Sequence, residues 1–169
     1  GWAGFTGTLT PRKSKAPDDV PEDYVMRRSQ VVLAYKGGAW TTVTLELMHD
    51  EVGSTEEPEA RIGQRALDLF ALLGLPEPDP VPLLAVHHQI AQKLHACTSV
   101  GSTGANERAH DLVDLQLLVA EESPDLARVR STARRLFMSR RRHSWPPTVV
   151  AHPNWDTIYA KESDGLEVL

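Results

Sequence analysis

Four charged residues lie in two apolar helical stretches between residues 89 and 118: Lys93, Arg108, Asp111 and Asp114. A helix that packs against a core needs only apolar residues at three- and four-residue spacing, so packing does not explain these charges. Arg108, Asp111 and Asp114 recur every three residues, and on a helix each lies about 60° round from the last, so all three share a face. If the two helices are antiparallel neighbours, we expect Lys93 to approach that face.

The residue types allow two interpretations of this group. Lys93 carries a flexible point charge that suits phosphate oxygens, but its stem could equally lie along the surface with the ammonium group in water. The arginine and the two aspartates could form a ladder of i,i+3 ion pairs. Alternatively, clustered carboxylates suit a hard cation such as Mg²⁺. The residues alone leave these alternatives open.

A second group of charges is basic, within a chain that is otherwise acidic. The segment RRLFMSRRRHSW places five arginines within a short span: Arg134, Arg135, Arg140, Arg141 and Arg142. Cations near a helix C-terminus complement the helix dipole, but five arginines exceed that need. With Phe137 and Trp145 nearby, the segment is predicted to contact phosphates of RNA or of a nucleotide.

The sequence lacks the residue spacing that a zinc site or a hydrolase active site needs. His88, His95, Cys97 and His110 lie close in sequence, but no Cys-x-x-Cys or His-Glu-x-x-His pattern indicates a zinc site. A hydrolase with a Ser or Cys nucleophile can be drawn from the same residues, but no nucleophile elbow supports it.

The elements that would position these residues follow from the hydrophobic periodicity. Residues 24–35 and 40–48 are predicted strands joined by the turn segment KGGA, and the strict alternation in the second strand predicts that one of its faces is buried. From residue 58 the period becomes helical. Pro82 suits the first turn of a helix. Helices are expected over about 58–73, 82–97, 107–121, 125–139 and 155–161.

Composition limits the class of protein. With 169 residues and 41% hydrophobic content, the chain can bury a core as one domain or as a domain with an appendage. A formal charge of -5 argues against a wholly basic nucleic-acid binder. Its one cysteine excludes an internal disulfide framework, and no apolar run has the length of a membrane span. We therefore expect a soluble, cytoplasmic protein that does not bind membranes.

Two short motifs in the helical half resemble those of a known family. Lys93-Leu94-His95-Ala96 is followed by Arg108, by Asp111-Leu112 and by Asp114-Leu115. The upstream segment WTTVTLELMHDEVG resembles a late strand of the same family's catalytic domain. In this order and spacing, residues 24–145 resemble the C-terminal portion of the AbiEii/AbiGii-type nucleotidyltransferase toxin family.

The resemblance implies an α+β fold. A β-hairpin or antiparallel sheet, as the remnant of a nucleotidyltransferase-like fold, would be followed by a helical C-terminal bundle. The expected divisions are a sheet-containing part over residues 1–53, a helical domain over 54–145 that carries both motifs, and a C-terminal tail over 146–169.

The resemblance also implies an activity, namely transfer of a nucleotide from a nucleoside triphosphate to an RNA or protein acceptor, with Mg²⁺ as cofactor. Some relatives modify RNA, including tRNA ends, and many operate with an antitoxin protein. Lys93 would contact the nucleotide phosphates, and Asp111 or Asp114 would orient the lysine or help to activate the acceptor. Further candidates are Glu46 as a metal carboxylate, and four substrate-binding arginines: Arg108, Arg140, Arg141 and Arg142.

The family's Gly-Ser turn and Asp-x-Asp metal motif are expected upstream of residue 24, and neither is present there. Gly101-Ser102 followed by Asp111 only imitates that order, because DLVD shares a face on a helix whereas Asp-x-Asp shares one on a strand. Either an N-terminal portion is missing, which the start at Gly1 without Met favours, or the protein binds without catalysing. The fragment alone is expected to be inactive. The alternative function is a noncatalytic RNA- or protein-binding helical module that uses the arginines of residues 134–142.

Overall fold

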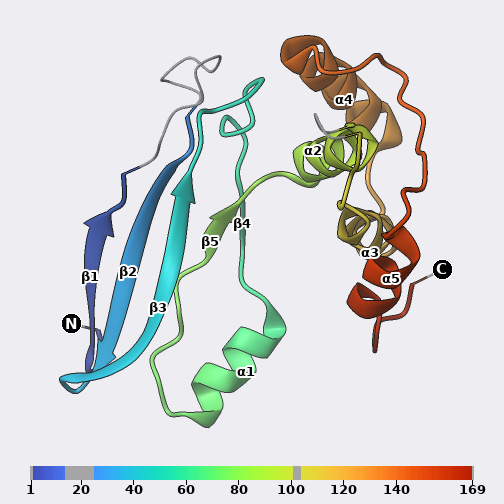
Figure 1. Ribbon diagram of the computed structural model, residues 1–169. Helices are drawn as coiled ribbons and strands as arrows, with labels where there is room; N and C mark the ends of the chain where they lie inside the picture. The colour runs from blue at the N-terminus through green and yellow to red at the C-terminus, as the bar shows by residue number, and fades with distance from the viewer. Residues whose placement is uncertain (1, 14–24, 101–103, 169) are drawn as a thin grey trace. The chain divides into compact units, whose positions relative to one another are not determined.

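The computed structural model describes residues 2–13, 25–100 and 104–168. Contacts divide the chain into two compact units, which we describe separately (Figure 1). Unit 1 comprises Gly1–Asp50 and Arg61–Val81, and unit 2 comprises Glu51–Ala60 and Pro82–Leu169. The family domain boundaries predicted at residues 53 and 145 stay predictions.

Unit 1 contains a three-stranded antiparallel sheet in the order β1-β2-β3. The strands are β1 (Phe5–Pro11), β2 (Arg27–Tyr35) and β3 (Gly38–Leu47), so the predicted hairpin is confirmed. Lys36 and Gly37 form its turn, with φ angles of 47° and 83°. Two consecutive positive φ values are typical of the type I′ turn, whose twist matches that of paired strands.

The strand register places several apolar side chains of the three strands on one face of the sheet. Val31 lies opposite both Leu9 and Val43, while the neighbouring pair Gln30 and Thr44 faces the other way. Burial of that face was expected from the alternation, and this prediction is wrong, because every residue of β3 is exposed. The helix α1 (Gln64–Leu72) buries none of its own residues, so it does not supply a covering layer.

Unit 2 is mainly helical. Its helices are α2 (Val86–Thr98), α3 (His110–Glu122), α4 (Leu126–Arg140) and α5 (Trp155–Glu162), each within a few residues of its predicted place. The start of α2 was predicted wrongly, because Pro82 lies in the short strand β5 (Val81–Leu83), which pairs with β4 (Glu59–Arg61). Because Val81–Leu83 are extended and paired with β4, α2 begins only at Val86.

Helix α2 lies between α3 and α4 and contacts both (Figure 1). Against α4, the small side chains of Ala91 and Ala133 are fully buried and let the helices approach closely beside Leu136. At the other end, Trp155 of α5 packs against Cys97 and donates its indole N–H to the Asn106 carbonyl at 2.6 Å. These contacts fix the orientation of α2 and therefore of the side chains that it carries.

The architecture is α+β, with an antiparallel sheet followed by helices, as predicted. Within the described ranges, no helix combines the length and the apolar character needed to cross a membrane. The predicted connection around Gly101 and Ser102 falls outside the described residues.

Helix α4 begins at a side-chain cap that permits a first prediction. The Asp125 carboxylate accepts hydrogen bonds from the backbone N–H groups of Ala127 at 2.9 Å and Arg128 at 3.2 Å. Because these donors have no partner within the helix, Asp125→Ala is expected to lower the free energy of unfolding by about 1 kcal/mol. Urea denaturation followed by circular dichroism measures it. Glu121→Ala, at an exposed position of α3, is the control, and an equal loss in both variants would contradict the capping role.

Candidate functional site

The packing of α2 against α3 brings Lys93 to the two aspartates. Its Nζ lies 2.5 Å from Asp114 Oδ2 and 3.5 Å from Asp111 Oδ1. Both aspartates are on α3, one turn apart, so their carboxylates share the face that meets α2. The predicted approach of Lys93 to this face is therefore confirmed.

Arg108 completes the group from the turn that precedes α3. Its Nε donates to Asp111 Oδ2 at 2.6 Å, so the predicted i,i+3 ion pair forms although α3 begins only at His110. The turn is held by Asn106, which is buried, and whose side-chain oxygen accepts a hydrogen bond from the Arg108 backbone N–H at 2.7 Å. Sequence reasoning missed Asn106, although Asn shortly before a helix is typical of such a side-chain-to-backbone turn.

The four side chains differ in their exposure to solvent. Asp111 is only 1% exposed, whereas Lys93 is 28%, Asp114 42% and Arg108 50% exposed. A buried carboxylate is stable when its charge is paired and hydrogen-bonded, and Asp111 meets both conditions through Lys93 and Arg108. Asp111 is thus the fixed centre of the group, while the side chains of Lys93 and Asp114 are partly exposed to solvent.

The described residues do not fit a magnesium site. A hard cation needs several oxygen ligands, yet Asp111 and Asp114 are both already bonded to cationic side chains. No cluster of three or more His, Cys, Asp or Glu residues suited to a metal occurs in the described parts of the chain. Glu46 of unit 1 forms an ion pair with Arg28 at 2.8 Å, and its role as a metal ligand stays a prediction.

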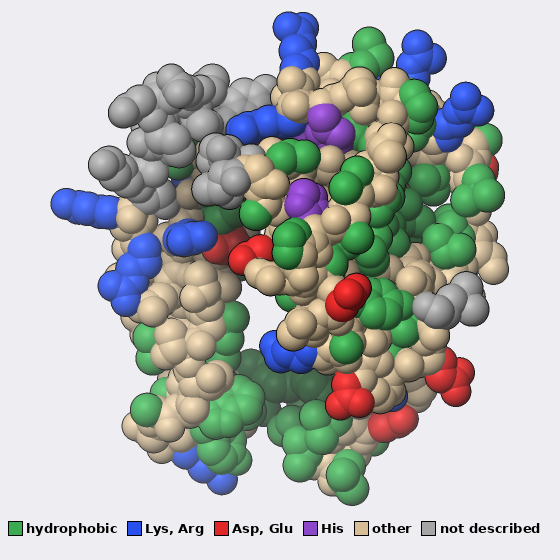
Figure 2. Space-filling view, turned by 45° about the vertical axis from the view of Figure 1, so that its right-hand side comes forward, with side chains coloured by type: hydrophobic (Ala, Val, Ile, Leu, Met, Phe, Trp, Pro, Cys, Tyr) green, Lys and Arg blue, Asp and Glu red, His purple; other side chains and the backbone are tan. Residues whose placement is uncertain are grey.

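The predicted substrate-binding arginines of residues 140–142 have different surroundings. Arg140 is occupied, because its guanidinium binds the Glu51 carboxylate through two nitrogens and donates to His95 Nδ1 at 3.2 Å. Arg141 ends α4 in a left-handed conformation with φ of 50°. Arg141 and Arg142 are exposed, as are other Lys and Arg side chains that project from the surface in Figure 2. Substrate binding by all three stays a prediction.

His95 and Cys97 lie near Lys93 in sequence but are buried, unlike the Lys93 ammonium. Burial, reinforced by Arg140 and His143, lowers the pKa of His95 to about 4, so its ring is neutral near pH 7. Burial, reinforced by Asp111, raises the pKa of Cys97 to about 11, which keeps the thiol protonated. Because the thiolate is the nucleophilic form, Cys97 is unsuited to nucleophilic catalysis.

Comparison with known proteins gives a family. No curated protein matches the sequence. The model of one protein family, described as "Nucleotidyl transferase AbiEii toxin, Type IV TA system", matches residues 4–167. This match extends beyond both ends of the segment, residues 24–145, in which the motifs were recognised, and it includes unit 1 as well as the Lys93 group. The α+β architecture is consistent with the nucleotidyltransferase-like fold that the motifs led us to expect. The chain therefore belongs to the AbiEii nucleotidyltransferase toxin family of type IV toxin–antitoxin systems.

Proposed function

We propose that Lys93 binds the phosphates of a nucleoside triphosphate during nucleotide transfer to an RNA acceptor. The observation that carries this proposal is the position of the Lys93 ammonium, which is held by two carboxylates at the end of a side chain that is 28% exposed. A lysine side chain has about 2 kcal/mol of rotamer entropy to lose on ordering. The carboxylates order it before the nucleotide arrives, and the exposed part of the ammonium is available to phosphate oxygens.

The two aspartates would have separate roles. Asp111 is buried and bonded to both cations, so it acts as a positioning residue for Lys93 and Arg108. Asp114 is more exposed, and the ion pair recorded for its carboxylate is the one with Lys93. When Lys93 turns to the phosphates, the Asp114 carboxylate becomes free to accept the proton of the acceptor hydroxyl. The hydroxyl oxygen then bonds to the α-phosphorus, and the bond to the leaving pyrophosphate breaks.

Surface charge supports RNA as the acceptor. Five arginines of α4 and the residues after it are exposed and form no ion pair with the described residues: Arg130, Arg134, Arg135, Arg141 and Arg142. Guanidinium groups bind phosphates through two parallel hydrogen bonds, and a row of them suits an RNA backbone. The family further implies an antitoxin partner, and a reaction that consumes nucleoside triphosphate is expected in the cytoplasm.

The test compares Lys93→Gln with the wild type. Loss of one charge-assisted contact, about 1.5–3 kcal/mol, is expected to weaken binding of a fluorescent nucleoside triphosphate about tenfold or more. Fluorescence anisotropy measures the affinity, and incorporation of α-labelled nucleotide into total RNA by the complete gene product measures transfer. Lys161→Gln, at a lysine that is 81% exposed, is the matched control and should change neither value.

Three outcomes separate the possibilities. Transfer that falls in Asp114→Asn while nucleotide affinity is kept would support the proton-accepting role. Equal affinity and equal labelling by wild type and Lys93→Gln would remove Lys93 from the mechanism. If the wild type bound RNA without transferring label, and Lys93→Gln bound RNA equally well, the noncatalytic RNA-binding alternative would be supported instead.

A further inference from the structure

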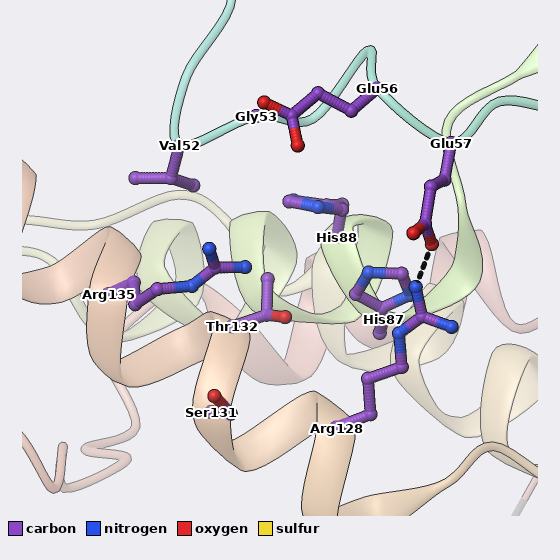
Figure 3. A pocket seen from close by; sticks show the side chains of 10 residues that line it. All are labelled: Val52, Gly53, Glu56, Glu57, His87, His88, Arg128, Ser131, Thr132 and Arg135. Atoms are coloured by element: carbon purple, nitrogen blue, oxygen red, sulfur yellow. Dashed lines mark hydrogen bonds and ion pairs between the residues drawn. The ribbon is translucent and has the colours of Figure 1, made fainter.

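Unit 2 contains a pocket of about 230 Å³ (Figure 3). One wall is the segment that includes Gly53, Glu56 and Glu57, a second is the start of α2 at His87 and His88, and the third is α4. His87 and His88 precede Lys93 by six and five residues, which places them about 120° and 140° round α2 from it. The pocket is therefore on a different face of α2 from the Lys93 group.

The wall formed by α4 presents cations and hydroxyl groups on one helix face. Arg128, Ser131, Thr132 and Arg135 have the spacing i, i+3, i+4 and i+7, which aligns side chains along a helix. Arg128 is paired with Glu57, as the dashed line in Figure 3 shows. Arg135 has no ion pair with the described residues, and Figure 3 shows its guanidinium beside Thr132. One guanidinium of the pocket is thus available.

Two polar side chains of the pocket are more than nine-tenths buried, yet neither has a hydrogen bond to any described residue. These are His87, 9% exposed, and Thr132, 1% exposed. Burial, together with Arg128 and His88, lowers the pKa of His87, so near pH 7 its ring offers one N–H donor and one acceptor. Among the described residues, the buried polar atom recorded without a partner is His95 Nε2, so the polar atoms of His87 and Thr132 are reached from the pocket, where a ligand or ordered water can hydrogen-bond to them.

We propose that this pocket binds a phosphate-type anion, held by the Arg135 guanidinium, the Thr132 hydroxyl and the His87 ring. The planar guanidinium donates two parallel hydrogen bonds to such an oxyanion, and the hydroxyl and imidazole add donors where solvent is reduced. A free phosphate, the phosphate of a mononucleotide and the phosphodiester of RNA share this chemistry. The proposal does not depend on the role of Lys93, because the two sites use different residues.

Glu56 provides a second test, in which a substitution is expected to strengthen anion binding. It lies on the wall opposite α4, and Figure 3 shows its carboxylate turned back toward Gly53. Gly53 has φ of +74°, and a Cβ there would come within 2.9 Å of the Glu56 carboxyl carbon. The glycine therefore permits this close approach, and the Glu56 charge remains on the pocket wall, where it opposes a bound anion.

The experiment titrates the complete protein with inorganic phosphate, with a nucleoside monophosphate and with a dinucleotide phosphodiester, by isothermal calorimetry at low salt. Arg135→Gln is expected to weaken binding about tenfold or more, because it removes a charge-assisted contact. Arg65→Gln is the control, since Arg65 is an exposed arginine that does not line the pocket, and it should change affinity less than about twofold. Glu56→Gln should tighten binding.

The three ligands identify the source of the phosphate. The pocket recognises the class of ligand that binds the wild type most tightly and whose binding Arg135→Gln weakens. Equal weakening by Arg65→Gln and Arg135→Gln would overturn the proposal in favour of general attraction between the anion and the positive charges of the protein. It would also be overturned by the absence of saturable binding, or by weaker binding in Glu56→Gln. Circular dichroism of each variant confirms that folding is unchanged.

Discussion

Replacing Asp111 with Asn is expected to lower the free energy of unfolding by about 3 kcal/mol, at the low end of the range for breaking a buried ion pair. Asp111 is 1% exposed and neutralises both Lys93 and Arg108. The variant keeps the shape of the side chain but leaves two cations without their shared anion. The loss should stay near the low end because Lys93 and Arg108 are partly exposed, so water solvates part of each charge.

Asp114→Asn is the matched comparison on the same helix. It breaks a shorter contact to Lys93, at 2.5 Å, but Asp114 is 42% exposed, and exposed pairs contribute about 0–1 kcal/mol. Urea denaturation of both variants measures the difference. If Asp114→Asn destabilised the protein as much as Asp111→Asn, burial would not be what distinguishes the two carboxylates. The separation of a positioning role from a proton-accepting role would then lose its basis.

The arrangement of the Lys93 group followed from local sequence. The three-residue spacing of Arg108, Asp111 and Asp114 fixes their common face as soon as the segment is helical or enters a helix. Lys93 then needed only that α2 and α3 be neighbours, which short connections between helices favour. The hairpin was equally local, because Lys36 and Gly37 adopt the positive φ values that a tight turn requires.

Contacts between distant segments were not predictable in this way. Arg140 forms an ion pair with Glu51, a residue 89 positions away in the sequence, and the sequence did not predict this contact. The period of a helix shows which way Arg140 faces and does not show which loop will cover it. The exposure of β3 could not be predicted for the same reason. Alternation of apolar and polar residues shows that one face of a strand is suited to burial, but it does not show whether another layer covers that face.

The described residues contain no cluster of His, Cys, Asp or Glu suited to a metal. The motifs identified the family, and the family model then matched residues 4–167. The carboxylates in the Lys93 group are paired with cations, so the group supplies phosphate binding and proton transfer in the proposed function and not metal ligation. Nucleotide transfer depends on phosphate binding and on proton transfer together, whereas nucleotide affinity reports on phosphate binding by Lys93.

Acidification from pH 6.5 to about pH 4 is expected to destabilise the protein through His95, by on the order of 3 kcal/mol. His95 is 4% exposed, and burial and the Arg140 guanidinium lower its pKa from 6.5 to about 4. Between these two values the unfolded chain binds a proton on this ring and the folded chain does not. The stability is therefore fully present above pH 6.5 and is lost progressively as the pH falls toward 4.

The hydrogen bonds around His95 explain why protonation is so unfavourable. Arg140 donates to Nδ1 at 3.2 Å, so the neutral ring carries its proton on Nε2, and a second proton would have to enter at the nitrogen that faces the guanidinium. The buried Nε2 has no hydrogen-bond partner among the described residues, so the added charge would be poorly solvated. His87 and His143, whose pKa values are lowered in the same direction by burial, should add to the effect.

The measurement is the free energy of unfolding in urea at several pH values between 7.5 and about 4, for wild type and His95→Gln. The glutamine carbonyl can still accept from Arg140 but does not titrate, so the difference between the two curves isolates the ring. That difference should change steadily as the pH falls below 6.5. Parallel curves for His95→Gln would show that the acid sensitivity arises elsewhere, because a buried ring with a lowered pKa must contribute a slope in this window.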